Sequence, residues 1–394
     1  MGYLPRYKVP CDVYSTLKPF LLFNKIFGIS LRRHGEKKTF LYIHYILSVL
    51  WTIFLIFSGS LEFISLVIFL EHQRTQAVNE SSTKILNVEL ENNKTLETED
   101  HIINRSVSLH ILEPMLVLTL YLSSILSIVM TSGVFRNTYV SGFESLSRVD
   151  ELLRFLLHDK YLQSKKHFYA NIIQVFALII YITLTFVLFV IDECKDFTLF
   201  CLYIFTADGI SNFITTLNIL LFSNCVIVLK KRYESLNSFL QKYSSTLTVE
   251  REAEINRITT ITDSQIHTLR VVFIQLYDVT NMVNSVFGLF ILVFTLYSLV
   301  NVLSTITFFM YKYNVLLNNF QTFVWCLYSV MLSVGISIVC EMAVGECAQS
   351  PIIVQKILAR KDLGHDVIDK LEKLFVQLNA MKIEFTACGM FNID

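Results

Sequence analysis

Asp208 is the ionisable residue whose position in the sequence most needs a chemical explanation. It lies about eleven residues into an apolar run, roughly 16 Å from the end of that run if the run is a helix. No Lys or Arg falls within any of the long apolar runs to pair with it. An acid at mid-membrane depth costs about 2.5–3.5 kcal/mol on insertion scales. A ligand-facing acid and a neutral, hydrogen-bonded structural acid both satisfy this constraint.

Other polar and aromatic side chains fall at a similar depth in neighbouring apolar runs. These residues are Tyr181, Asn212, Tyr297, Asn301, Gln321 and Trp325. Together with Asp208 they offer hydrogen-bonding groups and ring faces, which are the two features of a small-molecule site. We predict that they line an outward-facing ligand pocket, although each residue taken singly is also typical of packing between helices.

Three further acids lie near the ends of apolar runs, where a simpler explanation is available. They are Glu62, Glu113 and Glu341. A carboxylate near the end of a membrane helix can extend into the interface while its carbon atoms stay in the apolar layer. We therefore interpret these three residues as interfacial.

The sequence carries no signature of an enzyme. It lacks H-E-x-x-H, G-x-S-x-G, a P-loop and the Rossmann glycine pattern. Its eight Cys have neither C-x-x-C nor zinc spacing. The net charge is zero, which gives no bulk attraction to nucleic acid. We expect no enzymatic activity, no cofactor, no metal and no nucleic-acid partner.

Long apolar helices must position the candidate residues. The chain is 53% hydrophobic, and its apolar residues gather into runs of roughly 20 or more, enough to cross about 30 Å of hydrocarbon. Gly (12) and Pro (5) are scarce, which favours long helices over a sheet with many turns. We predict an all-α polytopic membrane protein in a lipid bilayer. The predicted spans are about 40–57 with a tilted extension to 70, 111–134, 170–191, 197–229, 286–310 and 320–344.

Polar segments divide the rest of the chain. Several of them carry apolar residues at helical spacing, which predicts amphipathic helices rather than open loops. The segment 230–283 has two such stripes, and a third stripe runs from Val367 to Met381. The expected parts are a cytoplasmic amino terminus 1–38, a transmembrane domain 39–344 with an extracellular loop 71–108 and inner helices 135–168 and 230–283, and a cytoplasmic segment 345–394.

Two independent signals give the same orientation. All N-x-[ST] sequons of the chain begin at Asn79, Asn93 and Asn104, within the segment 71–108, and used sequons face the lumen and then the exterior. Most of the 33 Lys and Arg lie in the segments that this orientation places in the cytosol, as the positive-inside rule requires. We predict an internal amino terminus and glycosylation of the first loop; unused sequons in a polar loop are the alternative.

Three stretches of the carboxyl-terminal third carry a family resemblance. They are CEMAVGEC at 340–347, FTACGMFNID at 385–394, and LYDVTN at 276–281 followed by Asn284 and FGL at 287–289. These stretches resemble the insect gustatory receptor family, and the layout of inner segments is similar over nearly the whole chain. The specific motifs cover about a fifth of the chain.

The resemblance implies a chemosensory receptor subunit that binds a small tastant and gates a cation conductance. It implies a homo- or hetero-tetramer with related receptors, in the plasma membrane of sensory neurons. In that family spans 2 to 6 enclose the ligand and a seventh helix lines the pore. The sequence as given ends at Asp394, where the resemblance places the start of that helix.

Two other functions fit the same residues. A secondary transporter would use Asp208 to couple a proton or ion, and it predicts pH-dependent uptake without channel current. A non-conducting partner subunit would associate with a full-length relative through its amphipathic inner helices. Packing of those helices within one chain is an equally acceptable interpretation.

Overall fold

The computed structural model describes a bundle of long helices. The described residues are 13–27, 38–88, 96–157, 164–193, 199–244, 262–311, 316–360, 363–387 and 391–393. Their helices are α1 (Val13–Ile26), α2 (Lys38–Val88), α3 (Leu96–Ile128), α4 (Arg136–Leu157), α5 (Ser164–Glu193), α6 (Leu199–Ser244), α7 (Asp263–Tyr311), α8 (Leu316–Leu358) and α9 (His365–Ala380). The predicted all-α fold is confirmed.

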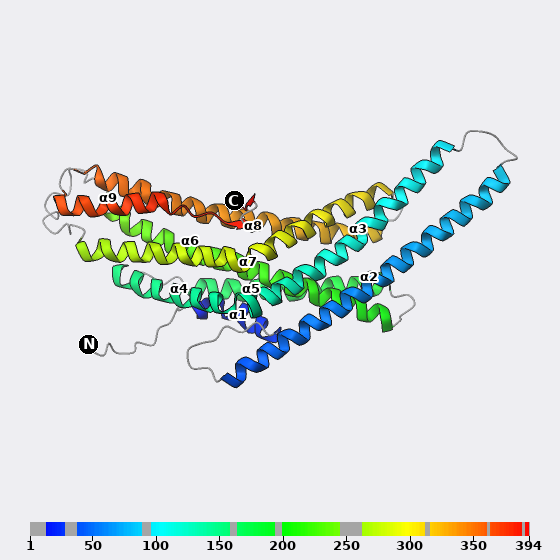
Figure 1. Ribbon diagram of the computed structural model, residues 1–394, viewed down its shortest axis with the longest axis horizontal. Helices are drawn as coiled ribbons and strands as arrows, with labels where there is room; N and C mark the ends of the chain where they lie inside the picture. The colour runs from blue at the N-terminus through cyan, green and yellow to red at the C-terminus, as the bar shows by residue number, and fades with distance from the viewer. Residues whose placement is uncertain are drawn as a thin grey trace.

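Two small irregular elements accompany the helices. A π-helical turn, η1 (Val129–Val134), joins α3 to α4. The strands β1 (Thr386–Ala387) and β2 (Phe391–Asn392) pair antiparallel near the carboxyl end. This end lies beside the middle of the bundle, where β1 packs on α7 (Figure 1). There the side-chain amide of Asn284 donates to the carbonyl of Glu384 at 2.7 Å.

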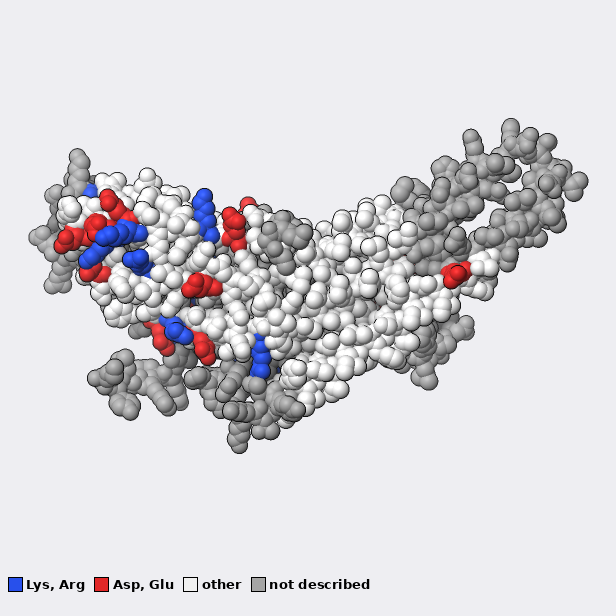
Figure 2. Space-filling model, viewed as in Figure 1, with Lys and Arg blue, Asp and Glu red and all other residues white. Residues whose placement is uncertain are grey.

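Six helices have the length and composition to cross a membrane, as the sequence predicts. The candidate spans are Ile43–Phe69, Ile111–Val134, Phe168–Thr185, Thr206–Ser244, Asp263–Thr307 and Phe323–Leu358. Large apolar side chains stand exposed along them, including Ile53, Ile180 and Met331. On the face drawn in Figure 2, charged side chains gather at the end of the molecule that carries α9, and few lie along the middle. This distribution suits lipid around the middle of the bundle.

Two of the helices are longer than predicted. The sequence predicts that the spans 197–229 and 286–310 are separate from the helices of 230–283. In the structure α6 continues to Ser244 and α7 begins at Asp263. No Gly or Pro interrupts 210–244 or 263–287, so backbone hydrogen bonding continues from the apolar into the polar part. The predicted stripes lie buried on these extensions, among them Tyr233, Leu236, Ile266 and Phe273.

The first loop is also shorter than predicted. The sequence predicts a polar loop at 71–108, whereas α2 extends to Val88 and α3 begins at Leu96, so both helices project beyond the rest of the bundle (Figure 1). The segment has no Gly or Pro and is rich in helix formers. Asn79 and Asn104 belong to these helices, and Asn93 lies outside the described residues.

The part of the bundle next to α9 has an aromatic and aliphatic core. Tyr139 of α4 packs edge-on against Phe287 of α7 with ring centroids 5.8 Å apart, and Tyr233 of α6 packs edge-on against Phe273 of α7 at the same separation. α9 contributes Leu371, Leu374 and Leu378, which confirms the apolar stripe predicted near the carboxyl end. This core fixes the positions of α6, α7 and α8, from which the candidate residues project.

Candidate functional site

The ring-bearing candidates come together between α5 and α8. Tyr181 of α5 lies edge-on to Trp325 of α8, with ring centroids 5.6 Å apart. Tyr181 also stacks on Tyr328, one turn further along α8, at 4.1 Å and an interplanar angle of 20°. The sequence predicts that Tyr181 and Trp325 line a ligand pocket, and in the structure their rings are in contact. Tyr328 was not among the predicted residues, although it follows Trp325 by one helical turn.

The amide-bearing candidates connect this contact to α6 and α7. The hydroxyl of Tyr297 donates to Oδ1 of Asn212 at 3.5 Å, and Nδ2 of Asn212 donates to the carbonyl of Asp208 at 3.1 Å. The amide of Asn301 donates to Oγ of Ser329 at 3.0 Å. The Tyr297–Asn212 bond joins α7 to α6 and the Asn301–Ser329 bond joins α7 to α8, so these two bonds also fix the helices relative to one another, whereas the Asn212–Asp208 bond lies within α6.

Tyr328 joins the two sets. Its hydroxyl donates to Oγ1 of Thr216 on α6 at 3.1 Å, while its ring stacks on Tyr181. We name the residues Tyr181, Tyr297, Trp325 and Tyr328 the aromatic cluster. Gln321 belongs to α8, but its side chain lies outside the described residues.

Asp208 lies at the edge of this cluster, beside a second acid. The carboxyl groups of Asp208 on α6 and Glu62 on α2 interact, and the hydroxyl of Tyr121 on α3 interacts with both. We name Glu62, Asp208 and Tyr121 the acid cluster. Asp208 also faces Tyr297, which places the acid cluster next to the aromatic cluster. Glu62 lies in the last third of the candidate span Ile43–Phe69, within the longer helix α2.

Close contacts between α2, α3 and α6 bring the acid cluster together. The hydroxyls of Ser58 on α2 and Tyr203 on α6 lie 2.8 Å apart and share a hydrogen bond. Gly59 lets the ring of Tyr121 lie directly against α2, since a Cβ atom at Gly59 would come within 2.8 Å of that ring. Small residues permit such close approach of helices in membranes.

The oxygens of the acid cluster are buried against one another. Oε2 of Glu62, Oδ1 of Asp208 and the hydroxyl of Tyr121 are buried, and the three groups lie within hydrogen-bonding range of one another. Tyr121 is only 3% exposed. Because buried polar atoms are nearly always paired, these mutual contacts between α2, α3 and α6 join the three helices.

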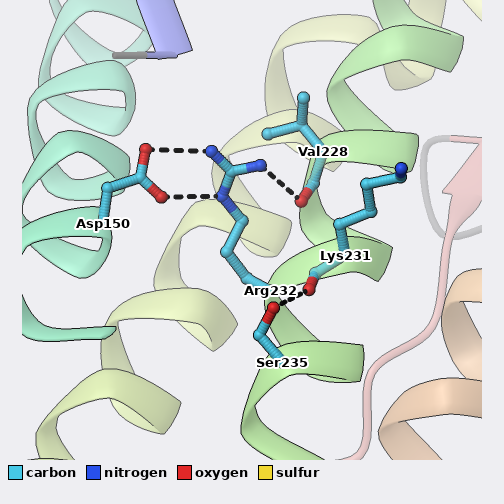
Figure 3. Close-up of polar contacts among 5 residues, drawn as sticks. All are labelled: Asp150, Val228, Lys231, Arg232 and Ser235. Carbon is cyan, nitrogen blue, oxygen red and sulfur yellow. Dashed lines mark hydrogen bonds and ion pairs between the residues drawn. The ribbon is translucent and has the colours of Figure 1, made fainter. Parts of the chain in front are cut away.

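A second buried ionic group, formed by Asp150 and Arg232, lies between α4 and α6. Arg232 donates from Nε to Oδ1 of Asp150 at 3.0 Å and from Nη2 to Oδ2 at 2.9 Å (Figure 3). Its Nη1 donates to the carbonyl of Val228 at 3.0 Å. The side chains of Arg232 and Asp150 are 9% and 3% exposed. This bidentate pair, which the sequence analysis missed, joins two helices with every charge compensated.

The candidate residues supply hydrogen-bonding groups and ring faces. Within the part of the chain that the structure describes, no group of three or more His, Cys, Asp or Glu is placed to hold a metal ion. The described site offers aromatic faces, amides, hydroxyls and two carboxyls between membrane helices. These are the types of group that line small-molecule sites in proteins.

Comparisons with known proteins agree with this description. The fold is similar to the insect olfactory receptor OR5 from Machilis hrabei, with a TM-score of 0.64, 11% identity, and coverage of 96% of this chain and 92% of that chain. The structure of that receptor in complex with eugenol is similar with a TM-score of 0.55, 10% identity and the same coverage. No curated protein matches this chain by sequence. The model of the 7tm chemosensory receptor family matches residues 104–394, and the chain therefore belongs to that family.

Proposed function

We propose that this chain is a chemosensory receptor subunit in which a small molecule binds among α5, α6, α7 and α8 and gates a cation conductance. The observation that carries the proposal is the convergence of Tyr181, Asn212, Tyr297, Asn301 and Trp325 in a member of this family. The likeness to a receptor solved with eugenol supports a small organic ligand. A tastant, as the sequence resemblance implies, is the ligand class we favour.

Direct contact between rings suggests how a ligand acts. Tyr181 of α5 stacks on Tyr328 of α8, and Tyr328 is in turn hydrogen-bonded to α6. A flat molecule that enters between these rings must separate α5 from α8. A ligand shifts the equilibrium between the closed and the conducting state only by its differential affinity for these two states. If a ligand that separates α5 from α8 activates the channel, the separated arrangement belongs to the conducting state.

The cellular setting belongs to the same proposal. The amino terminus faces the cytosol, and the sequons at the outer ends of α2 and α3 carry glycans. The subunit works as a homo- or hetero-tetramer with related receptors in the plasma membrane of sensory neurons. The distribution of Lys and Arg and the family membership support this arrangement.

Recording ligand-evoked current tests the proposed function. Cells express the chain alone or together with a related receptor, and cation current is measured over a panel of tastants and odorants. We expect a current from at least one compound, with its half-maximal concentration raised by Trp325→Ala and unchanged by Tyr169→Phe on the exposed face of α5. Current only on co-expression identifies a non-conducting partner subunit. Uptake that depends on pH, without current, replaces the receptor proposal by the transporter.

A further inference from the structure

The short helix α1 is bonded to two of the candidate membrane spans. The indole Nε1 of Trp51, in the span of α2, donates to the carbonyl of Ile26 at 3.0 Å. The side-chain amide of Asn171, in the span of α5, donates to the carbonyl of Thr16 at 2.8 Å. Because one bond lies near each end of α1, the helix is fixed beside both spans.

One row of side chains along α1 is exposed. Lys18, Leu22 and Ile26 follow one another at intervals of four residues, so they lie on one face of the helix. Lys18 is exposed, and Leu22 and Ile26 are 59% and 52% exposed. Leu17 and Phe20 are fully buried and attach α1 to the bundle. The row therefore faces away from the protein core.

The two neighbouring helices also expose large apolar side chains. Leu50 and Ile53 of α2, and Tyr169 and Ile173 of α5, are each more than half exposed. Along a membrane span such side chains contact the acyl chains of lipids. Since α1 is bonded to both spans, its exposed leucine and isoleucine lie next to surfaces that lipid covers.

The first residue of the row carries a positive charge. Lys18 precedes Leu22 by about 6 Å and Ile26 by about 12 Å along the helix axis. Lys18 and Lys25 are the charged residues of α1, which contains no acid. The first turn of α5, the helix that α1 contacts, adds the lysines of the sequence SKKH at 164–167 and again no acid. Lysines near a membrane surface attract anionic lipid headgroups.

We propose that α1 and the first turn of α5 bind an anionic phospholipid, with its phosphate at Lys18 and one acyl chain along Leu22 and Ile26. The charge of the lysines complements the headgroup, and the apolar side chains follow at the depth of the acyl chain. The inference goes beyond the proposed receptor function, because it requires neither a gating ligand nor a conductance.

Trp51 can report on lipid at this place. Its indole is bonded to the carbonyl of Ile26, and its ring packs on Phe27 with centroids 5.3 Å apart. The chain has two Trp, so Trp325→Phe leaves Trp51 as the single source of tryptophan fluorescence. The full chain is placed in phosphatidylcholine nanodiscs that contain increasing fractions of a phospholipid brominated at mid-chain, because bromine quenches tryptophan at short range.

The comparison is between brominated phosphatidylserine and brominated phosphatidylcholine. We expect phosphatidylserine to reach half-maximal quenching at a mole fraction lower by about fivefold or more, because each lysine near the surface favours the anionic headgroup. The wild-type chain, read from the summed emission of both tryptophans, should show the same preference. That measurement needs no variant to fold.

Charge variants assign the preference to α1. Lys18→Gln should reduce the preference for phosphatidylserine about fivefold, since it removes one charge at the headgroup. Lys373→Gln changes an exposed lysine of α9, and as the matched control it should keep the preference.

Three results would overturn the proposal. The first is equal quenching by the two lipids, and the second is a preference that Lys18→Gln leaves unchanged. The third is displacement of the brominated lipid by water-soluble glycerophosphoserine, which would assign the lysines to a free phosphate ester instead of a lipid. None of these results bears on the receptor function, which the current recordings decide separately.

Discussion

Two buried ionic groups of this molecule differ in composition and in how their charge is met. Asp150 with Arg232 satisfies its carboxylate with two guanidinium hydrogen bonds between α4 and α6. Glu62 with Asp208 brings two acids together beside the hydroxyl of Tyr121, and among the described residues no ion pair with a cation is formed there. Both lie between long helices, so burial alone does not separate them.

The difference lies in how each group compensates its charge. A bidentate ion pair compensates both charges, and it holds its two helices in one arrangement. A pair of acids without a cation compensates its charge only by sharing a proton or by accepting hydrogen bonds. The first arrangement joins α4 to α6, and the second lies between α2, α3 and α6. The predictions below use stability to separate the two.

We expect the greatest loss of stability when the Asp150–Arg232 ion pair is broken. Asp150→Asn keeps the shape of the side chain and leaves the guanidinium of Arg232 buried without its counter-charge. We expect the free energy of unfolding to fall by about 3 kcal/mol or more. Reversible SDS titration of the purified chain measures it.

The control for this prediction is an exposed pair. Lys373→Ala removes the bond to Asp369 on the surface of α9 and should leave the unfolding curve where it is. The combined variant Asp150→Leu with Arg232→Met should recover most of the lost stability, because no unpaired charge remains. A double variant as unstable as Asp150→Asn would show that packing, rather than charge, explains the loss.

Close packing beside the acid cluster gives the next effect. Gly59→Ala places a Cβ atom within 2.8 Å of the Tyr121 ring, and relief of that clash should cost about 1–3 kcal/mol of unfolding free energy. Gly209→Ala on α6 is the matched control, since its Cβ would meet no atom within 4 Å. The same titration compares them, and equal stability of the two variants would contradict the close approach of α2 and α3.

A smaller loss is expected at the aromatic cluster. Tyr328→Phe keeps the ring stacked on Tyr181 and removes the hydrogen bond to Thr216. We expect a loss of about 1 kcal/mol. Tyr169→Phe, at an exposed position on α5, should change nothing measurable. If both variants unfold as the wild type does, the bond between α8 and α6 contributes no stability.

The smallest loss of stability is expected at Asp208, and it compares directly with the loss at Asp150. Asp208→Asn is the same chemical change as Asp150→Asn, but it removes an acid whose neighbour is Glu62 rather than a guanidinium. We expect the free energy of unfolding to stay within about 0.5 kcal/mol of the wild type, or to rise. A loss as large as that of Asp150→Asn would mean that the acid cluster holds the fold together and is not free for a ligand.

Much of the candidate site could be predicted from residue type and depth. Polar and aromatic groups deep in apolar runs need partners, and this criterion selects Tyr181, Asn212, Tyr297, Asn301 and Trp325. They do meet, because helices that span one layer bring residues of equal depth to the same level. The partners Tyr328 and Thr216 were missed, although each lies one turn from a predicted residue.

Glu62 shows why the rest could not be predicted. Its distance from the end of its apolar run predicts an interfacial acid, but that distance says nothing about which side chains Glu62 meets. The rotation of α2 turns Glu62 toward Asp208. Rotation depends on contacts such as Gly59 against Tyr121, between residues far apart in the sequence.

Six candidate membrane helices follow from the sequence alone, because length, hydropathy and helical spacing are local properties. The tertiary structure was needed to show that Asp150 meets a guanidinium and that Asp208 meets another acid. That pairing depends on how helices distant in the chain rotate and pack against one another, and no local pattern encodes it.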